Sequence, residues 1–114
     1  MHSIAPNTVV NAATVPLDTA DVPTSQVAEG RPRTGTATLG TFADLEVGVW
    51  EMSVGGMRDT EIDELFVVIA GNARVEFHDG SAAIELGVGD VVRLSAGAQT
   101  LWTVREPLRK VYLA

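Results

Sequence analysis

Cysteine is absent from the sequence. Without it the chain cannot form disulfide bonds, thiolate nucleophiles, thiolate metal sites or iron–sulfur clusters. Histidine is nearly absent too, because the chain has only two, His2 and His78. A catalytic set of serine, histidine and aspartate, or a metal site built on several imidazole ligands, is therefore not expected.

Basic residues are also scarce. Eight lysines and arginines face fifteen acidic residues, which gives a net charge of −7, and Lys110 is the single lysine. Nucleic acids and anionic membranes are bound by clustered basic side chains. The sequence has no such cluster, so we expect no nucleic-acid partner and no membrane partner.

Long hydrophobic runs are missing. The longest uninterrupted apolar stretch covers residues 65–70, whereas a membrane-spanning helix needs about 20 apolar residues. No lysine or arginine precedes Arg31, so the N-terminal residues lack the charged start of a signal peptide. We expect a cytoplasmic protein.

The composition that is present is typical of one folded domain. The chain has 114 residues, of which 46% are hydrophobic and 20% charged, and a chain of this size can bury one core without covalent staples. Residues 1–35 hold four of the five prolines. We interpret residues 1–35 as an irregular N-terminal arm packed on a domain of residues 36–114, with residues 8–10 as one optional short strand.

Apolar and polar residues alternate from residue 36 onward. Ala73, Val75 and Phe77 alternate with polar residues, and Asp79-Gly80 follows at once. Period-two alternation predicts a half-buried strand, and the Asp-Gly pair predicts a hairpin turn. Similar short segments, separated by glycine-containing turns, recur to the end of the chain. The pattern predicts about eight strands in an all-β sandwich, jelly roll or small barrel.

Two segments make this pattern more specific. In residues 64–71, Glu64 begins an apolar strand that ends at Gly71, and residues 89–97 contain a Gly-Asp turn, a strand and a second glycine. Either segment alone is common in β proteins. Their order and separation, with the Asp79-Gly80 hairpin between them, resemble the two conserved motifs of cupins.

The flanking residues extend the resemblance over residues 22–114. The segments around Trp50, before the first motif, and around Trp102, after the second, resemble small single-domain cupins similar to the barrel of (S)-ureidoglycine aminohydrolase and to ethanolamine-utilisation cupins. The resemblance implies a double-stranded β-helix, which is a jelly-roll barrel, and often a homodimer formed by packing of sheets. We therefore expect an all-β cupin barrel over residues 36–114 that associates with a second copy of itself.

The usual cupin metal site is not matched. Catalytic cupins usually hold a metal with one glutamate and three histidines. The resemblance places these ligands at Glu64, at Thr100, and at either Met57 and Asp59 or Arg58 and Thr60. Only the glutamate is present, and one carboxylate is too few for a catalytic transition metal. We expect no metal site of this kind and no cofactor.

A carboxylate-rich run offers an oxygen-only alternative. In an extended chain Asp59, Glu61 and Asp63 share one face and Glu64 takes the other. The run then cannot converge on Glu64 without a bend. We interpret it as a solvated acidic turn, and weak binding of Mg²⁺ or Ca²⁺ is the alternative.

The barrel interior is the candidate site. The resemblance points Glu64 inward, and period-two alternation along the strands adds further side chains to the same face. The catalytic candidates are Glu64, Lys110 and Tyr112. The ligand-binding candidates are Arg58, Thr60, Phe66, Thr100 and Trp102.

We predict metal-free binding of a small metabolite, because a few polar groups in an apolar cleft are typical of ligand sites. One alternative is an enzyme of the nitrogen-metabolite hydrolase or isomerase type, with Glu64 as the base and Lys110 or Tyr112 as the proton donor. A structural ion pair between Glu64 and Lys110 competes with that role, because two buried charges are retained best when they pair. A non-catalytic structural dimer is the other alternative.

Overall fold

The computed structural model describes residues 4–114 and consists of β-strands joined by turns and irregular segments. His2 lies outside the described residues. The strands are β1 (Thr19–Asp21), β2 (Val27–Glu29), β3 (Arg33–Phe42), β4 (Leu45–Met52), β5 (Gly55–Thr60), β6 (Glu64–Phe77), β7 (Ile84–Leu86), β8 (Val91–Leu94) and β9 (Gln99–Leu113). The all-β prediction is confirmed. Within residues 4–114 there is no helix long and apolar enough to cross a membrane.

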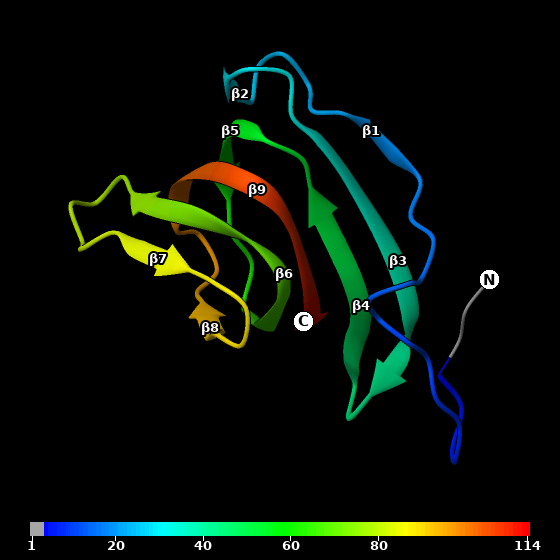
Figure 1. The fold of residues 1–114 in the computed structure, drawn as a ribbon. Coiled ribbons are helices and arrows are strands. Elements are labelled where there is room, and N and C mark those ends of the chain that lie inside the picture. Colours follow the sequence, from blue (N-terminus) through cyan, green and yellow to red (C-terminus); the bar gives the residue numbers. More distant parts are fainter. Residues whose placement is uncertain (1–3) are drawn as a thin grey trace.

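The two longest strands, β6 and β9, form the spine of the fold. They have 14 and 15 residues and pair antiparallel along most of their length. On its other edge β9 pairs first with β5 and then with β4. The edge of β6 that does not contact β9 pairs first with β8 and then with β7. Because the spine curves, the strands on its two halves face each other across one interior (Figure 1).

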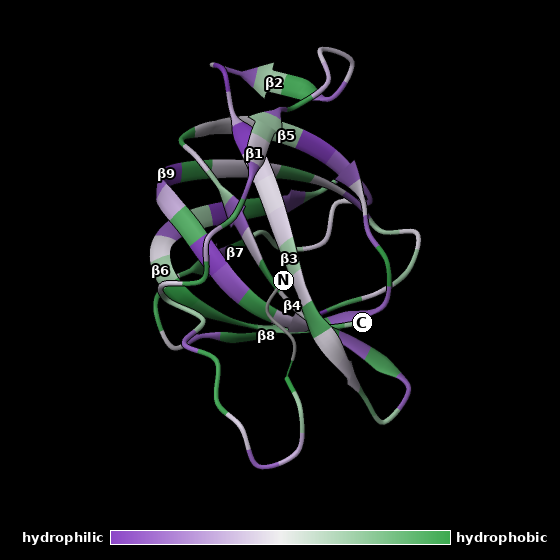
Figure 2. Ribbon diagram, turned by 90° about the vertical axis from the view of Figure 1, so that its right-hand side faces the viewer, coloured by the Kyte–Doolittle hydropathy of each residue, from purple (hydrophilic) through white to green (hydrophobic). Residues whose placement is uncertain are grey.

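Side chains along β9 alternate between the interior and the outer face. The alternation holds on both sides of an exposed stretch at residues 105–107. Figure 2 shows that hydrophilic and hydrophobic segments follow one another along β9. The buried side chains of β9 are those of Thr100, Trp102, Val104, Leu108, Lys110 and Tyr112. Period two therefore brings one lysine and one tyrosine into a core that is otherwise largely apolar.

The N-terminal segment covers part of the outer face. Val15 is buried together with Leu39 of β3 and Val49 of β4. The short strands β1 and β2 extend the sheet by pairing with β3 and β5. Residues 8–10 form no strand, so that prediction is wrong. The division of the chain into residues 1–35 and 36–114 stays a prediction, and β3 begins slightly before it at Arg33.

Another part of the outer face is not covered by any segment of residues 4–114. Leu65 on β6 is 42% exposed, and Val91 on the neighbouring strand β8 is 69% exposed. Because side chains alternate along β6, Leu65 points to the outer face, and its neighbour Phe66, which is 2% exposed, points inward. The homodimer that would bury this face stays a prediction.

Gly71 permits the close approach of β6 and β9. Its φ is 79°, and a Cβ atom there would overlap the carbonyl oxygen of Pro107 and lie 2.6 Å from that of Glu106. We predict that Gly71→Ala lowers the free energy of unfolding by about 3 kcal/mol or more, because a left-handed backbone conformation and a backbone overlap act together. Urea-induced unfolding measures the loss.

Gly80 supplies the matched control. Its φ is 86°, but nothing lies within 4 Å of an added Cβ atom. Gly80→Ala should cost only about 1 kcal/mol, the conformational part of the penalty. Equal losses in the two variants would mean that backbone conformation alone, and not the approach of β9, requires glycine at residue 71.

Candidate functional site

The barrel contains an interior cavity of about 400 Å³ that opens to solvent and lies between β4, β9 and the segment that joins β5 to β6. Its wall combines two tryptophans with several carboxylates, hydroxyl groups and one ammonium group. The lining residues are Thr36, Glu46, Trp50, Asp59, Thr60, Glu61, Ile62, Glu64, Trp102, Lys110, Tyr112 and Ala114.

Lys110 is held in place by one carboxylate and three aromatic rings. Its Nζ lies 2.5 Å from Oε2 of Glu64, and the two side chains are only 6% and 10% exposed. The same nitrogen lies 4.2 Å from the ring centroid of Phe66, 4.6 Å from that of Trp50 and 5.1 Å from that of Trp102. An ammonium ion removed from water is stabilised by opposite charge and by the faces of aromatic rings. The ammonium group of Lys110 is thus removed from water, and its charge is compensated by these contacts.

Strand register explains why these groups meet. Lys110 is opposite Trp50 on β4 and opposite Val68 on β6, and Glu64 opens β6 on the same inward face as Phe66 and Val68. Trp102 lies on β9 on the same face as Lys110. The cluster is therefore built almost wholly on paired strands, which position side chains more rigidly than loops do.

Glu61 is a site residue that the sequence analysis placed on the wrong face. It follows β5, where the chain bends: its N–H donates to Ala98 O at 2.8 Å, and its C=O accepts from Gly97 N at 2.9 Å. The bend turns the carboxylate inward, where Oε2 accepts hydrogen bonds from Thr100 Oγ1 at 2.6 Å and from Trp102 Nε1 at 2.9 Å. The side chain is not a solvated acidic residue, because Glu61 is only 7% exposed.

Tyr112 forms another polar contact in the cavity. Its hydroxyl group donates to Glu46 Oε2 at 2.6 Å. Burial, reinforced by this hydrogen bond and by the charge of Glu46, raises the pKa of the Tyr112 hydroxyl well above its usual range. Tyr112 packs against Gly48, where an added Cβ atom would lie 2.5 Å from the ring carbon Cζ. The hydroxyl therefore stays protonated at neutral pH and acts as a hydrogen-bond donor.

Asp59 lies at the edge of the cavity with its carboxylate partly buried. Burial raises its pKa, and the neighbouring charge of Glu61 raises it further. Its Oδ1 accepts only the backbone N–H of Thr60, at 2.8 Å, among the hydrogen bonds of the described residues. The carboxylate thus lacks a close cationic partner.

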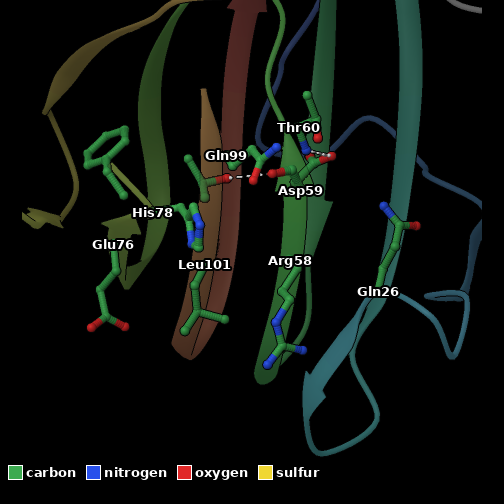
Figure 3. A pocket seen from close by; sticks show the side chains of 10 residues that line it. Gln26, Arg58, Asp59, Thr60, Glu76, His78, Gln99 and Leu101 are labelled. Atoms are coloured by element: carbon green, nitrogen blue, oxygen red, sulfur yellow. Dashed lines mark hydrogen bonds between the residues drawn. The ribbon is translucent and has the colours of Figure 1, made fainter. Parts of the chain in front are cut away.

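A second hollow lies on the outer face, over β5, β9 and β6, with a volume of about 510 Å³. Figure 3 shows Arg58, Gln26 and His78 among the side chains around it. Arg58 lines this outer hollow and not the interior cavity, whereas Thr60 lines both. Arg58 therefore shares this outer hollow with Thr60 and Thr100, but it lies apart from the predicted site residues Glu64, Trp102, Lys110 and Tyr112, which line the interior cavity.

The remaining predicted residues come together inside the barrel. Glu64, Lys110, Tyr112 and Trp102 line the interior cavity. Phe66 stacks against Lys110, and Thr100 supports Glu61. The contributions that sequence reasoning missed are those of Glu46, which binds Tyr112, and of Glu61. Glu46 lies on an exposed, alternating strand, and nothing in its local sequence distinguishes it from a surface residue.

Comparison with known proteins agrees with this architecture. Residues 39–112 match the family described as the EutQ-like cupin domain. A protein of unknown function from the DUF861 family of Pseudomonas syringae has a similar structure, with a TM-score of 0.73 and 25% identity. That alignment covers 88% of this chain but only 44% of the other protein. No curated protein matches.

Two ethanolamine-utilisation proteins share the fold. The Salmonella typhimurium protein, described as a putative EutQ, is 20% identical with a TM-score of 0.62, and the alignment covers 89% of this chain and 96% of that one. The Clostridium difficile EutQ protein is 20% identical with a TM-score of 0.63, with 82% and 73% covered. The predicted cupin fold is confirmed.

The residues at the usual cupin ligand positions do not fit a metal ion. Glu64 is already paired with the ammonium of Lys110, and the hydroxyl of Thr100 donates to Glu61. Across residues 4–114 no group of three or more histidine, aspartate or glutamate side chains is arranged to hold a metal. The Mg²⁺ or Ca²⁺ alternative gains no support from this arrangement.

Lys110→Met tests the buried ion pair. The change removes the ammonium but keeps an unbranched side chain of similar length. We predict that it lowers the free energy of unfolding by about 3–5 kcal/mol, because Glu64 is left buried without its partner. Arg105→Met is the matched control: Arg105 pairs with Glu85, the side chains are 50% and 54% exposed, and the loss should stay below about 1 kcal/mol.

The double variant Lys110→Met with Glu64→Gln separates charge from packing. It should regain part of the lost stability, because no uncompensated charge remains in the core. Urea unfolding of Lys110→Met, of Glu64→Gln and of the double variant gives the coupling energy of the pair. A loss for Lys110→Met no larger than that for Arg105→Met would show that the pair does not organise the interior.

Proposed function

The chain belongs to the EutQ-like cupin family, and we propose that its barrel binds a small metabolite directly, without a metal ion between protein and ligand. The proposal is carried by one observation: the barrel retains a cavity of about 400 Å³ lined by aromatic and polar side chains. Cavities of about 300–1,000 Å³ with a few convergent polar groups are typical of small-molecule sites.

The hydrogen-bonding groups of the cavity support binding. Thr60 offers a hydroxyl group, Tyr112 offers the oxygen of a hydroxyl whose proton is donated to Glu46, and Asp59 and Glu61 offer carboxylate oxygens at the cavity wall. Rigid strands position most of these side chains, so a ligand would meet a preformed site. A preformed site loses little conformational entropy when it binds.

The alternative of a nitrogen-metabolite hydrolase or isomerase that uses Glu64 and Lys110 has weaker support. A base must have a free lone pair directed at its substrate, and a proton donor must release its proton without leaving a buried charge unpaired. Glu64 and Lys110 are in contact with each other and are nearly sealed from solvent. Their arrangement suits a fixed wall of the site better than a reacting pair.

Thr36→Trp tests the cavity as the binding site. Thr36 is an exposed residue of β3 that lines the cavity and pairs with Trp50 on the neighbouring strand β4. An indole at residue 36 would fill the opening of the cavity. The unmodified protein is first screened by thermal shift against sugars, ureido compounds, amines and carboxylates. Compounds that raise the Tm of the unmodified protein should no longer do so in this variant, because binding stabilises the native state only where the site is accessible.

Thr41→Trp is the matched control. Thr41 is exposed on the same strand but does not line the cavity, so this variant should keep the full ligand-induced shift. Equal shifts in both variants would place binding elsewhere on the protein. If no compound of any class stabilises the unmodified protein, the proposed function is wrong.

A further inference from the structure

The charges around the cavity are strongly unbalanced. Four carboxylates line it, those of Glu46, Asp59, Glu61 and Glu64, against the single ammonium of Lys110. That ammonium is in direct contact with Glu64, so its charge is compensated locally. Glu46, Asp59 and Glu61 receive hydrogen bonds from neutral donors only. The cavity therefore holds a surplus of negative charge.

One carboxylate oxygen of Glu61, Oε1, faces the cavity without a hydrogen-bond partner among the described residues. Both side-chain hydrogen bonds of Glu61, from Thr100 and Trp102, go to Oε2, and no hydrogen bond of the described residues reaches Oε1. Glu61 is 93% buried, since its exposure is 7%. Yet no side-chain oxygen in residues 4–114 is both sealed and without a partner. Oε1 is therefore open to the cavity that Glu61 lines.

A carboxylate oxygen that faces a cavity inside the protein is stabilised when a ligand donates a hydrogen bond to it. A carboxylate that has left bulk water without a full set of partners carries a free-energy penalty. A donor that is itself positively charged relieves that penalty most, because hydrogen bonds between opposite charges are the strongest kind. Neutral acceptors and anions would increase the penalty instead.

The tryptophans of the cavity favour the same ligand chemistry. The rings of Trp50 and Trp102 lie 5.6 Å apart between centroids and are tilted by 59°. Both already lie close to one cation, the ammonium of Lys110, and both also line the cavity. Aromatic walls beside carboxylates are a general means of holding organic cations.

We propose that the ligand of the interior cavity is a small organic cation with N–H donors, an alkylammonium or alkylguanidinium compound whose charged group binds Oε1 of Glu61. This inference rests on the proposed function, because it names the class of ligand for the same cavity. The protein supplies a countercharge and aromatic faces, and the alkyl part of the ligand occupies the remaining volume.

The test compares three probes of different charge: butylguanidinium, its neutral isostere butylurea, and the smaller anion butyrate. Titration of the full chain, followed by calorimetry and by the two indole N–H resonances in NMR spectra, gives the affinities. Butylguanidinium should bind at least about ten times more tightly than butylurea, because only the cation gains a charge-assisted hydrogen bond. Its binding should shift the indole resonance of Trp102.

Glu61→Gln locates the effect. The amide keeps the shape and can still accept from Thr100 and Trp102, but the charge is gone. Affinity for butylguanidinium should fall by about tenfold or more, and affinity for butylurea should change by less than about twofold. Glu106→Gln removes the same charge from an exposed residue of β9 that does not line the cavity, and it should leave both affinities unchanged.

The outcomes distinguish this inference from the proposed function. If butylurea or butyrate binds in the cavity as tightly as butylguanidinium, the cation inference is wrong and the proposed function stands. A cation affinity that Glu61→Gln leaves intact also overturns the inference. If all three probes and the broader compound screen fail to bind the unmodified protein, both are overturned. The indole shifts in the unmodified protein provide a result even if the variant folds poorly.

Discussion

The contact between Lys110 and Glu64 is the interaction on which the interior depends. A lysine placed in a β-barrel core loses its hydration, and the cost of that loss is several kcal/mol unless the charge is compensated. Two kinds of contact compensate the charge of Lys110. Its Nζ lies 2.5 Å from a carboxylate oxygen of Glu64 and within 5.1 Å of the centroids of three aromatic rings. The surrounding strands must keep their register for all of these contacts to exist together.

The same contact changes what the barrel can do chemically. In metal-binding cupins the corresponding glutamate is free to ligate an ion. In this chain Glu64 is occupied by an ammonium that belongs to the protein itself. The cavity beside this pair keeps three further carboxylates, of Glu46, Asp59 and Glu61. This arrangement supports the proposal that the barrel recognises a ligand through hydrogen bonds and charge, and not through coordination to an ion.

Much of the fold could be predicted because period-two alternation has a simple structural cause. Successive side chains of a strand point to opposite faces, so the inward positions of Phe66, Trp102 and Lys110 follow once one residue of each strand is assigned. The bend after β5 could not be predicted in this way. It depends on backbone hydrogen bonds between Glu61 and the distant residues Gly97 and Ala98. That long-range contact turns Glu61 inward. Arg58 lies on the outer face because it alternates with the buried Met57 on β5.

We infer that an internal ammonium, and not a metal ion, is the partner of the Glu64 carboxylate in this barrel. The most direct test is the metal content of purified, untagged protein after incubation with a mixture of divalent ions and removal of the excess. We expect no stoichiometric metal, because a transition-metal site needs about three firm protein ligands and Glu64 is engaged by Lys110. About one tightly bound ion per chain, lost on Glu64→Gln, would contradict it.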